Sequence, residues 1–359
     1  MTGASFGGRA LGVAAGLALD RLLDEPPDAW HPVAWFGTAM GRVEQRLYAD
    51  TRLPGAGYAL VGVGLGAGSG LALAHLGRAG LGRTGRTGRT GRAGVVVPVA
   101  TAVAVASAGR MLLHTSGRIE EHLLADDLDG ARELLPWLVG RDPSSLDASG
   151  VSAAVVESLA ENTVDAVVAP VFWGLVAGAP GVLVHRAVNT MDAMVGHRSG
   201  RYARFGTAAA RLDDVMAWVP ARVFAVVVAV LAVTPARGQR SAERFLPARS
   251  AERFLPARAH HVLSTVCRDA PAHPSPNSGV AESAVAAALG VELGGPLRYG
   301  ERVEDRPRLG GGPRPDASTI TRARHLVDRV EIALAVGCLA LSWWRRPRPT
   351  LPVASPSCL

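Results

Sequence analysis

Three carboxylates and their polar neighbours lie in the middle of the chain, directly before an apolar segment. Glu157, Glu161 and Asp165 are spaced four residues apart in E-S-L-A-E-N-T-V-D, with Asn162 beside them. Residues four apart share one face of a helix, so the spacing predicts a stripe of carboxylates. Like charges repel unless a cation lies between them, and Mg²⁺ prefers oxygen ligands. We expect the three acids to hold a metal that carries phosphate, with Asn162 contacting substrate; a solvated helix face is the alternative.

A second polar stripe follows in V-H-R-A-V-N-T-M-D-A-M-V-G. His185, Asn189 and Asp192 are four and three residues apart, so they also share a helix face. An Asn and an Asp at this spacing can hold a ligand hydroxyl or a metal-bound water, and they can equally cross-link helices. We predict that Asn189 binds substrate and that Asp192 is a candidate catalytic base.

Arginines and further acids surround the next turn of the chain, in R-Y-A-R-F-G and R-L-D-D-V-M-A-W. Guanidinium groups suit phosphate or carboxylate, although basic residues that flank a membrane segment would look the same. We predict that Arg201, Tyr202 and Arg211 bind substrate. Asp213 is expected to join the metal ligands, and Asp214 is a candidate catalytic residue.

Two loops carry the remaining candidates. H-P-S-P-N-S-G places Ser275 and Asn277 before an expected helix, with Glu282 in the first turns of that helix. Backbone N–H groups at a helix start bind anions, although ordinary N-capping uses the same residue types. We expect these three residues to bind substrate. His31, in D-A-W-H-P-V near the start of the chain, is a further candidate base.

The composition indicates a membrane protein. Hydrophobic residues make up 48% of the chain and charged residues 19%, and the mean hydropathy is +0.19. The net charge of +7 comes with only 5% aromatic residues and with arginines between apolar segments, so it indicates membrane flanks and not nucleic-acid binding. The chain has no lysine, which excludes a phosphate-binding P-loop and Schiff-base chemistry. Three widely spaced cysteines indicate neither disulfides nor a zinc site.

The apolar segments predict an all-α, polytopic integral membrane protein with roughly four to six membrane-associated helices, some broken, joined by polar loops. Residues 166–184 contain Pro170, Gly178 and Pro180, which indicates two helices around a break. Residues 267–312 are expected to be loops around a helix at 281–289. The candidate membrane segments are 6–19, 56–76, 93–109, 166–184, 223–236 and 332–344.

We expect one membrane-embedded domain over residues 1–359. Residues 82–92 repeat G-R-T and predict a flexible insertion. Residues 241–258 contain S-A-E-R-F-L-P-A-R twice in tandem, which predicts a second insertion, in a loop. Residues 345–359 are expected to be a disordered tail.

These motifs together resemble the adenosylcobinamide-phosphate synthases of cobalamin biosynthesis, the CobD/CbiB membrane proteins. The resemblance covers about residues 20–310 and rests on the order of D-x-x-x-D-x-P, E-S-L-A-E-N-T-V-D-A-V-V-A-P, A-V-N-T-M-D-A-M-V-G, R-Y-A-R-F-G, A-R-L-D-D-V-x-x-W-V-P-A-R and S-P-N-S-G. The last motif departs from the usual S-P-N-A-G, and the two expected insertions are further departures from the family pattern. None of these differences removes a charged motif residue.

The resemblance implies a multi-pass enzyme of the bacterial inner membrane. It would join a carboxyl group of adenosylcobyric acid to the amine of 1-aminopropan-2-ol phosphate, or of free aminopropanol, with ATP as co-substrate and Mg²⁺ as cofactor. Its partners would be the corrinoid, the amine, the lipid bilayer and candidate enzymes of the same pathway. A membrane transporter and a non-catalytic scaffold of the corrinoid pathway are the alternatives that the sequence leaves open.

Overall fold

The computed structural model describes residues 3–23, 28–81, 91–140, 142–197, 200–233, 248–299 and 302–344. Most of the predicted 82–92 insertion, residues 241–247 and the predicted tail at 345–359 lie outside these ranges. The expectations of flexibility there, and of one domain over the whole chain, stay predictions.

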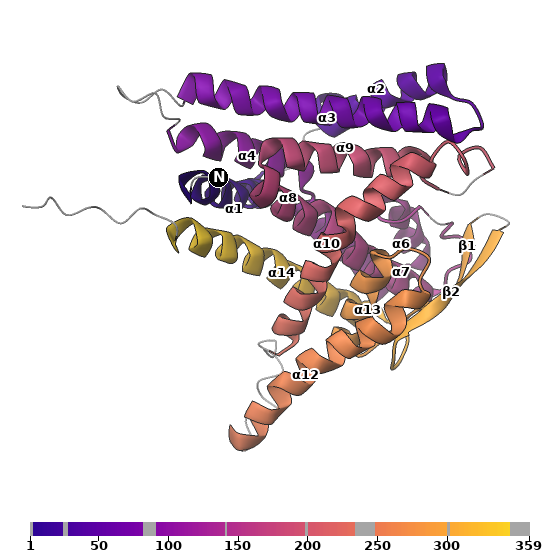
Figure 1. The fold of residues 1–359 in the computed structure, drawn as a ribbon. Coiled ribbons are helices and arrows are strands. Elements are labelled where there is room, and N and C mark those ends of the chain that lie inside the picture. Colours follow the sequence, from indigo (N-terminus) through magenta and orange to yellow (C-terminus); the bar gives the residue numbers. More distant parts are fainter. Residues whose placement is uncertain are drawn as a thin grey trace, which may run out of the picture.

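The described residues are helical apart from one β-hairpin, which confirms the all-α prediction in its main feature (Figure 1). The elements in chain order are α1 (Gly3–Leu22), α2 (Pro32–Leu47), α3 (Arg52–Leu81), α4 (Ala93–Ala106), α5 (Gly109–Leu124), α6 (Leu128–Leu134), α7 (Ala148–Thr163), a π-helical turn (Val164–Val168), α8 (Ala169–Ala177), α9 (Ala179–Val195), α10 (Thr207–Ala232), α12 (Ala248–Asp269), α13 (Ser278–Leu289), β1 (Glu292–Tyr299), β2 (Arg302–Gly310) and α14 (Ala317–Trp344).

Four segments are long and apolar enough to cross a membrane, which agrees with the expected polytopic membrane protein. They are Arg52–Gly80, Ala93–Leu124, Ala148–Ala177 and Thr207–Ala232. The predicted first and last segments belong to α1 and α14, which pack against each other, and α1 also packs against α4. Helices α3, α4, α1 and α14 lie next to one another in that order and form a layer (Figure 1).

Glycines let α3 and α9 approach closely. A Cβ atom on Gly66 would lie 2.8 Å from the carbonyl oxygen of Leu183, and one on Gly70 would lie 2.4 Å from the Cα atom of Pro180. Small residues at a helix interface allow this kind of packing in membranes, where close contact replaces the hydrophobic effect as the driving force. The glycines of α3 therefore let α9, which carries Asn189 and Asp192, pack closely against the helical layer.

The predicted break in residues 166–184 occurs at Gly178. This residue adopts φ 70° between α8 and α9, a conformation that favours glycine. Pro180 stands in the first turn of α9, where a missing N–H group costs nothing. Pro170 follows the π-helical turn without a break, and the carbonyl of Ala166 accepts the N–H of Ala108 at 3.3 Å. Because α9 folds back along α8, residues near the π-helical turn meet residues near the end of α9.

A β-hairpin occupies part of the stretch that the sequence predicted to be loops. Helix α13 confirms the expected helix at 281–289, but β1 and β2 then pair antiparallel from Glu292↔Gly310 onward. The segment E-L-G-G-P-L-R-Y lacks the apolar alternation typical of a half-buried strand, so its pattern gave no signal. Side chains of two helices fix the hairpin. The Gly294 N–H donates to Glu157 Oε1 of α7 at 2.9 Å, and the Gly310 N–H donates to Asp269 Oδ2 of α12 at 2.8 Å.

The tandem duplication also differs from the expected loop. Helix α12 begins at Ala248, directly after Pro247, and includes the second copy, residues 250–258. A proline ends a preceding helix more readily than it disturbs one that starts after it. Residues 248–258 are therefore helical and not a loop, while the insertion over residues 241–258 stays a prediction.

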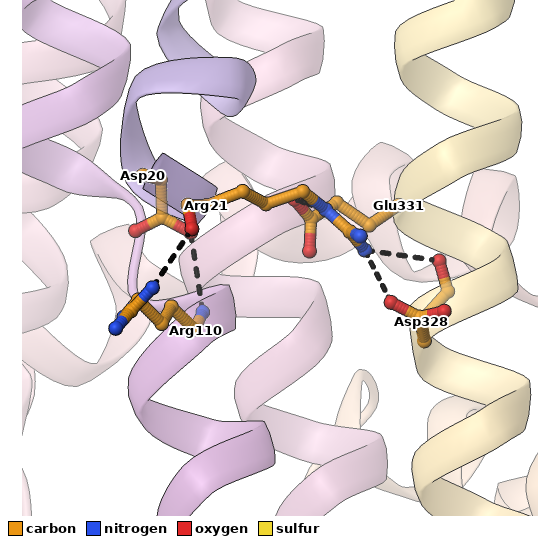
Figure 2. Close-up of polar contacts among 5 residues, drawn as sticks. All are labelled: Asp20, Arg21, Arg110, Asp328 and Glu331. Atoms are coloured by element: carbon orange, nitrogen blue, oxygen red, sulfur yellow. Dashed lines mark hydrogen bonds and ion pairs between the residues drawn. The ribbon is translucent and has the colours of Figure 1, made fainter. Parts of the chain in front are cut away.

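An ionic cluster joins α1, α5 and α14; we call Asp20, Arg21, Arg110, Asp328 and Glu331 the arginine cluster (Figure 2). Arg21 donates from Nε to Glu331 Oε1 at 2.7 Å and from Nη2 to Asp328 Oδ1 at 2.5 Å. Asp20 Oδ2 accepts from the backbone N–H of Arg110 at 3.2 Å, and Arg110 Nη1 donates to the carbonyl of Arg21 at 3.0 Å. Glu331 is only 2% exposed. Charged pairs thus fasten the end of α1 to two helices remote in sequence.

Candidate active site

Two adjoining polar cavities lie where α7, the π-helical turn, α9 and α10 meet the loop before α13. The larger, of about 880 Å³, and the smaller, of about 280 Å³, share part of their lining, including Glu161, Asp165, Asp192 and Arg306. We call the two together the acidic cavity. The residues that line it and were predicted as site residues are Glu161, Asn162, Asp165, Asn189, Asp192, Asp213, Asp214, Ser275 and Asn277.

One amide ties three of these elements together. Asn189 Nδ2 donates to Asp165 Oδ2 at 3.0 Å and lies 3.4 Å from Asp213 Oδ1. Asp165 belongs to the π-helical turn, Asn189 to α9 and Asp213 to the first turns of α10. The sequence left open whether this stripe cross-links helices or faces a ligand site. Asn189 does both, because it joins three helical elements and also lines the cavity. His185 of the same stripe is fully buried and does not line the cavity.

The predicted stripe of three carboxylates is divided by its surroundings. Glu161 and Asp165 line the cavity, whereas Glu157 is 2% exposed and accepts the N–H of Gly294 in the hairpin. The π-helical turn begins at Val164, between Glu161 and Asp165, and such a turn changes the direction of the side chains that follow. The structure thus gives Glu157 a contact with the hairpin instead of a place on the cavity wall.

Asp192 has an environment that changes its acidity. It stands near the C-terminal end of α9, outside the four candidate spans. Burial is the largest cause, and together with the nearby charges of Asp214 and Glu161 it raises the pKa of this carboxyl to about 6. A carboxyl group with such a pKa can accept a proton near neutral pH more effectively than an ordinary aspartate.

The S-P-N-S-G loop forms one wall of the cavity and is fixed by several hydrogen bonds. Asn277 accepts from Arg222 Nη1 at 2.9 Å and donates from Nδ2 to the carbonyl of Asp214 at 2.8 Å. Ser278 Oγ donates to Glu161 Oε1 at 2.8 Å. The loop therefore contacts both α10 and α7, and its side chains connect the two acidic helices.

His273, Arg306 and His197 also line the cavity, and sequence reasoning assigned them no role. His273 Nδ1 accepts the N–H of Ser275 at 3.1 Å, and its Nε2 lies 3.8 Å from Glu282 Oε1. Burial lowers the pKa of His273, so the imidazole is neutral at neutral pH. The signal for His273 was present, because it begins the H-P-S-P-N-S-G motif; Arg306 and His197 had no local signal of this kind.

Several predicted residues are not on the cavity wall: Glu157, Glu282, His31, Arg201, Tyr202 and Arg211. Glu282 is 1% exposed and lies beside His273. His31 caps α2 by accepting the N–H of Val33 at 3.2 Å, and Arg211 is exposed on α10. Their predicted functional roles stay predictions.

The predicted Mg²⁺ can be compared with the donor groups of the cavity. Within the described ranges, no group of three or more His, Cys, Asp or Glu side chains is arranged to hold a metal ion. Mg²⁺ usually needs only one or two carboxylates, with waters and substrate phosphates completing its shell. Asp165 and Asp213, which share the Asn189 amide, offer such a pair. Their oxygen atoms have the right chemistry for Mg²⁺ when a phosphate substrate supplies the other ligands.

The fold and the cavity define a polytopic helical membrane protein with an acidic polar site between its helices. Residues 13–327 match the family model described as CobD/Cbib protein. The chain is 42% identical over 340 residues to the cobalamin biosynthesis protein CobD of Mycobacterium tuberculosis, which covers 94% of this chain and 97% of the relative. It is 38% identical over 329 residues to CobD of Chromobacterium violaceum (89% and 92% covered) and 36% identical over 322 residues to CobD of Rhodobacter capsulatus (87% and 90% covered). No solved structure matches it.

The chain therefore belongs to the CobD/CbiB family of cobalamin biosynthesis.

Proposed function

We propose that this protein forms an amide bond between a carboxyl group of adenosylcobyric acid and the amine of 1-aminopropan-2-ol phosphate or aminopropanol, with ATP as co-substrate. The single observation that carries the proposal is the convergence of motif residues from four separate elements on one cavity, with Asn189 joining Asp165 and Asp213. The CobD names of the relatives support the pathway, and the resemblance of the motifs supports the reaction.

The reaction needs an activated carboxyl group, because a carboxylate oxygen is a poor leaving group. The substrate carboxylate attacks the γ-phosphorus of ATP, which forms an acyl phosphate and releases ADP. The neutral amine then attacks the acyl carbon, and the bond to the phosphate oxygen breaks to release inorganic phosphate. The ammonium form of the amine loses one proton before attack and the new amide nitrogen loses a second, so the step requires a base.

The residues of the cavity divide this work by their chemistry. Asp192 is the proposed base, because its carboxyl lines both cavities and its raised pKa suits proton transfer. Asp165 and Asp213 would hold Mg²⁺, which supplies positive charge to the phosphates of ATP. Arg306 lines both cavities and can stabilise developing negative charge. Asp214 is the alternative base, since it lies on the same wall as Asp213.

The choice of ATP also implies a side of the membrane. A site that consumes ATP faces the cytoplasm, so we place the acidic cavity at the cytoplasmic face of the bacterial inner membrane. The four candidate spans agree with a multi-pass protein, and the hairpin and α12 would then lie on the cytoplasmic side with the cavity.

Purified protein in detergent tests the proposal. It is supplied with adenosylcobyric acid, ATP, Mg²⁺ and either amine, and the amide product is measured by mass spectrometry together with ADP. We expect product and ADP in equal amounts, and loss of both in Asp165→Asn. Active transport of a corrinoid into vesicles without amide formation would favour a transporter, and a protein that supports the pathway in cells after Asp165→Asn and Asp213→Asn would favour a scaffold.

A further inference from the structure

The R-Y-A-R-F-G motif lies in the connection between α9 and α10, residues 196–206. This connection begins four residues after Asp192 and ends seven residues before Asp213. Gly196 and His197 at its start line the larger cavity. Arg201 and Tyr202 do not, although their residue types predicted a substrate clamp. The position of the connection therefore affects the cavity, while Arg201 and Tyr202 contact a residue outside the cavity lining.

Their partner is Glu44, near the C-terminal end of α2. Glu44 Oε1 accepts from Tyr202 Oη at 2.8 Å and from Arg201 Nη2 at 3.1 Å, and its side chain is 13% exposed. The guanidinium of Arg201 also lies 4.1 Å from the centre of the Tyr48 ring, and Tyr48 Oη donates to the Arg201 carbonyl at 3.0 Å. Two hydrogen bonds to one carboxylate, with a cation over an aromatic ring, make a contact stronger than an ordinary exposed ion pair.

The apolar side of the same contact permits little movement. Phe205 is fully buried, with its ring 5.4 Å from that of Tyr48 and 5.3 Å from that of Tyr58. A Cβ atom on Gly55 would lie 1.8 Å from the Phe205 carbonyl oxygen, and one on Gly206 would lie 1.8 Å from that of Val195. The backbone of the connection is therefore in direct contact with α3 and with the end of α9.

Tyr202 passes this restraint to the cavity wall. The rings of His197 and Tyr202 pack edge to face, with centres 5.2 Å apart and planes at 87°. His197 lines the larger cavity. A continuous series of contacts thus runs from Glu44 through Tyr202 and His197 to the cavity.

We propose that Glu44, Arg201 and Tyr202 form a latch that holds the α9–α10 connection in the position that the cavity requires, so that Arg201 and Tyr202 are positioning residues and do not clamp substrate. As an account of catalysis the latch rests on the proposed amide-forming function. A displacement of about 1 Å at a reacting group is enough to lower a rate by orders of magnitude, so loss of the latch reduces turnover even where substrate is not touched.

A double-mutant cycle tests the latch. Glu44→Gln and Tyr202→Phe are each expected to lower kcat of amide formation about tenfold and to change KM less than threefold. The double variant is expected to be no slower than the worse single variant, because both remove the same contact. If the two effects multiply, or if Tyr202→Phe raises KM while Glu44→Gln is silent, Tyr202 acts on substrate and the latch is wrong.

Asp50→Asn is the matched control. Arg204 of the same connection pairs with Asp50 at 3.6 Å, but both side chains are more than half exposed, so this pair should contribute little. We expect kcat of Asp50→Asn to stay within twofold of the wild type. An equal loss in Asp50→Asn and Glu44→Gln would show that any disturbance of the connection has the same effect, and would overturn the specific role of Glu44.

Hydrogen exchange separates the latch from the proposed activity. In Glu44→Gln, backbone amides of residues 200–206 are expected to exchange at least tenfold faster, while those of α7 stay at the wild-type rate. If Glu44→Gln exchanges faster but the wild-type protein shows no amidation activity, the latch is supported as a structural restraint and the proposed function is contradicted. Unchanged exchange would remove the latch whatever the activity.

Discussion

The arginine cluster and the acidic cavity both bury carboxylates from helices far apart in sequence, yet their charges differ. In the arginine cluster, Arg21 donates to Asp328 and Glu331, and Asp20 accepts the backbone N–H of Arg110 (Figure 2). Five carboxylates line the acidic cavity, and Arg306 is the only arginine among the described residues of its lining. The first set thus has two arginines for three carboxylates, whereas the second has one arginine for five.

This difference separates a structural set of acids from a candidate working site. A buried carboxylate without a nearby cation must take up a proton, bind a positive ligand or destabilise the fold. The cavity is therefore a place where a metal ion, an ammonium group or a proton is bound favourably. The arginine cluster has a smaller requirement, since Arg21 already supplies positive charge to Asp328 and Glu331. Proximity of acids to apolar segments does not distinguish the two, whereas the partner of each acid does.

The largest expected effect comes from removing a cavity carboxylate. Asp165→Asn keeps the size of the side chain and removes its charge, so we expect amide formation to fall about 100-fold or more while the protein remains folded. The same change in the arginine cluster, Asp328→Asn, should leave the rate within about threefold. Rates are measured by mass spectrometry of the product, and equal losses in the two variants would remove the distinction between the regions.

Removing Arg21 should leave the carboxylates of Asp328 and Glu331 without their shared positive partner. Arg21→Met leaves Glu331 and Asp328 without their shared partner, and we expect a loss of about 2 kcal/mol, reduced from the value for a fully buried pair because Arg21 is 34% exposed. Thermal unfolding in detergent measures the change. Arg21→Met combined with Glu331→Gln should recover part of the loss, and failure to recover would mean that Arg21 acts through packing alone.

Close contact in the arginine cluster gives a smaller effect. A Cβ atom on Gly109 would lie 2.6 Å from Glu331 Oε2, whereas one on Gly64 of α3 would meet no atom within 4 Å. Gly109→Ala should therefore lower stability by about 1–2 kcal/mol, and Gly64→Ala should be neutral or slightly stabilising. If both variants unfold at the wild-type temperature, the cluster tolerates rearrangement and its geometry is less fixed than the cavity.

The smallest effect concerns His273, a cavity residue that would add positive charge if it were protonated. Its folded-state pKa is lowered by burial, so folding keeps it neutral. The stability associated with it is complete above its unfolded pKa of about 6.5 and is lost as pH falls below that value, because only the unfolded chain then gains the proton.

His273→Gln removes this loss. Between pH 7.5 and 5.5 the melting temperature of the wild type should therefore fall more than that of His273→Gln, by about 1–3 °C. The opposite order would indicate that a protonated His273 balances the cavity acids, and the contrast with the arginine cluster would weaken.

Much of the cavity could be predicted from the sequence, because helical spacing and the order of the motifs identified Glu161, Asp165, Asn189 and Asp192, which converge as expected. The separation of Glu157 from the cavity could not be predicted, since it depends on a contact with a hairpin whose strands lack apolar alternation. Apolar lengths alone predicted roughly four to six membrane-associated helices, and four helical segments of the described residues are long and apolar enough to span.

The pairing of charged residues was beyond sequence reasoning for a different reason. Arg201 contacts Glu44, 157 residues away, and Asp20 caps a helix that begins 89 residues later. Spacing along one helix says nothing about which distant helix packs against it. A guanidinium that looks suited to phosphate can therefore belong to an internal contact, and only the three-dimensional arrangement separates the two cases.

Arg9 has a consequence for how the chain assembles during synthesis. Its Nη1 donates to the carbonyl of Val176 at 2.6 Å and lies 3.4 Å from that of Leu175, so it caps the last turn of α8 just before the reversal at Gly178. These carbonyls emerge from the ribosome more than 160 residues after Arg9 does. Arg9 can therefore make these hydrogen bonds only after α8 has been synthesised. The contact between α1 and the end of α8 is therefore one that forms late in the synthesis of the chain.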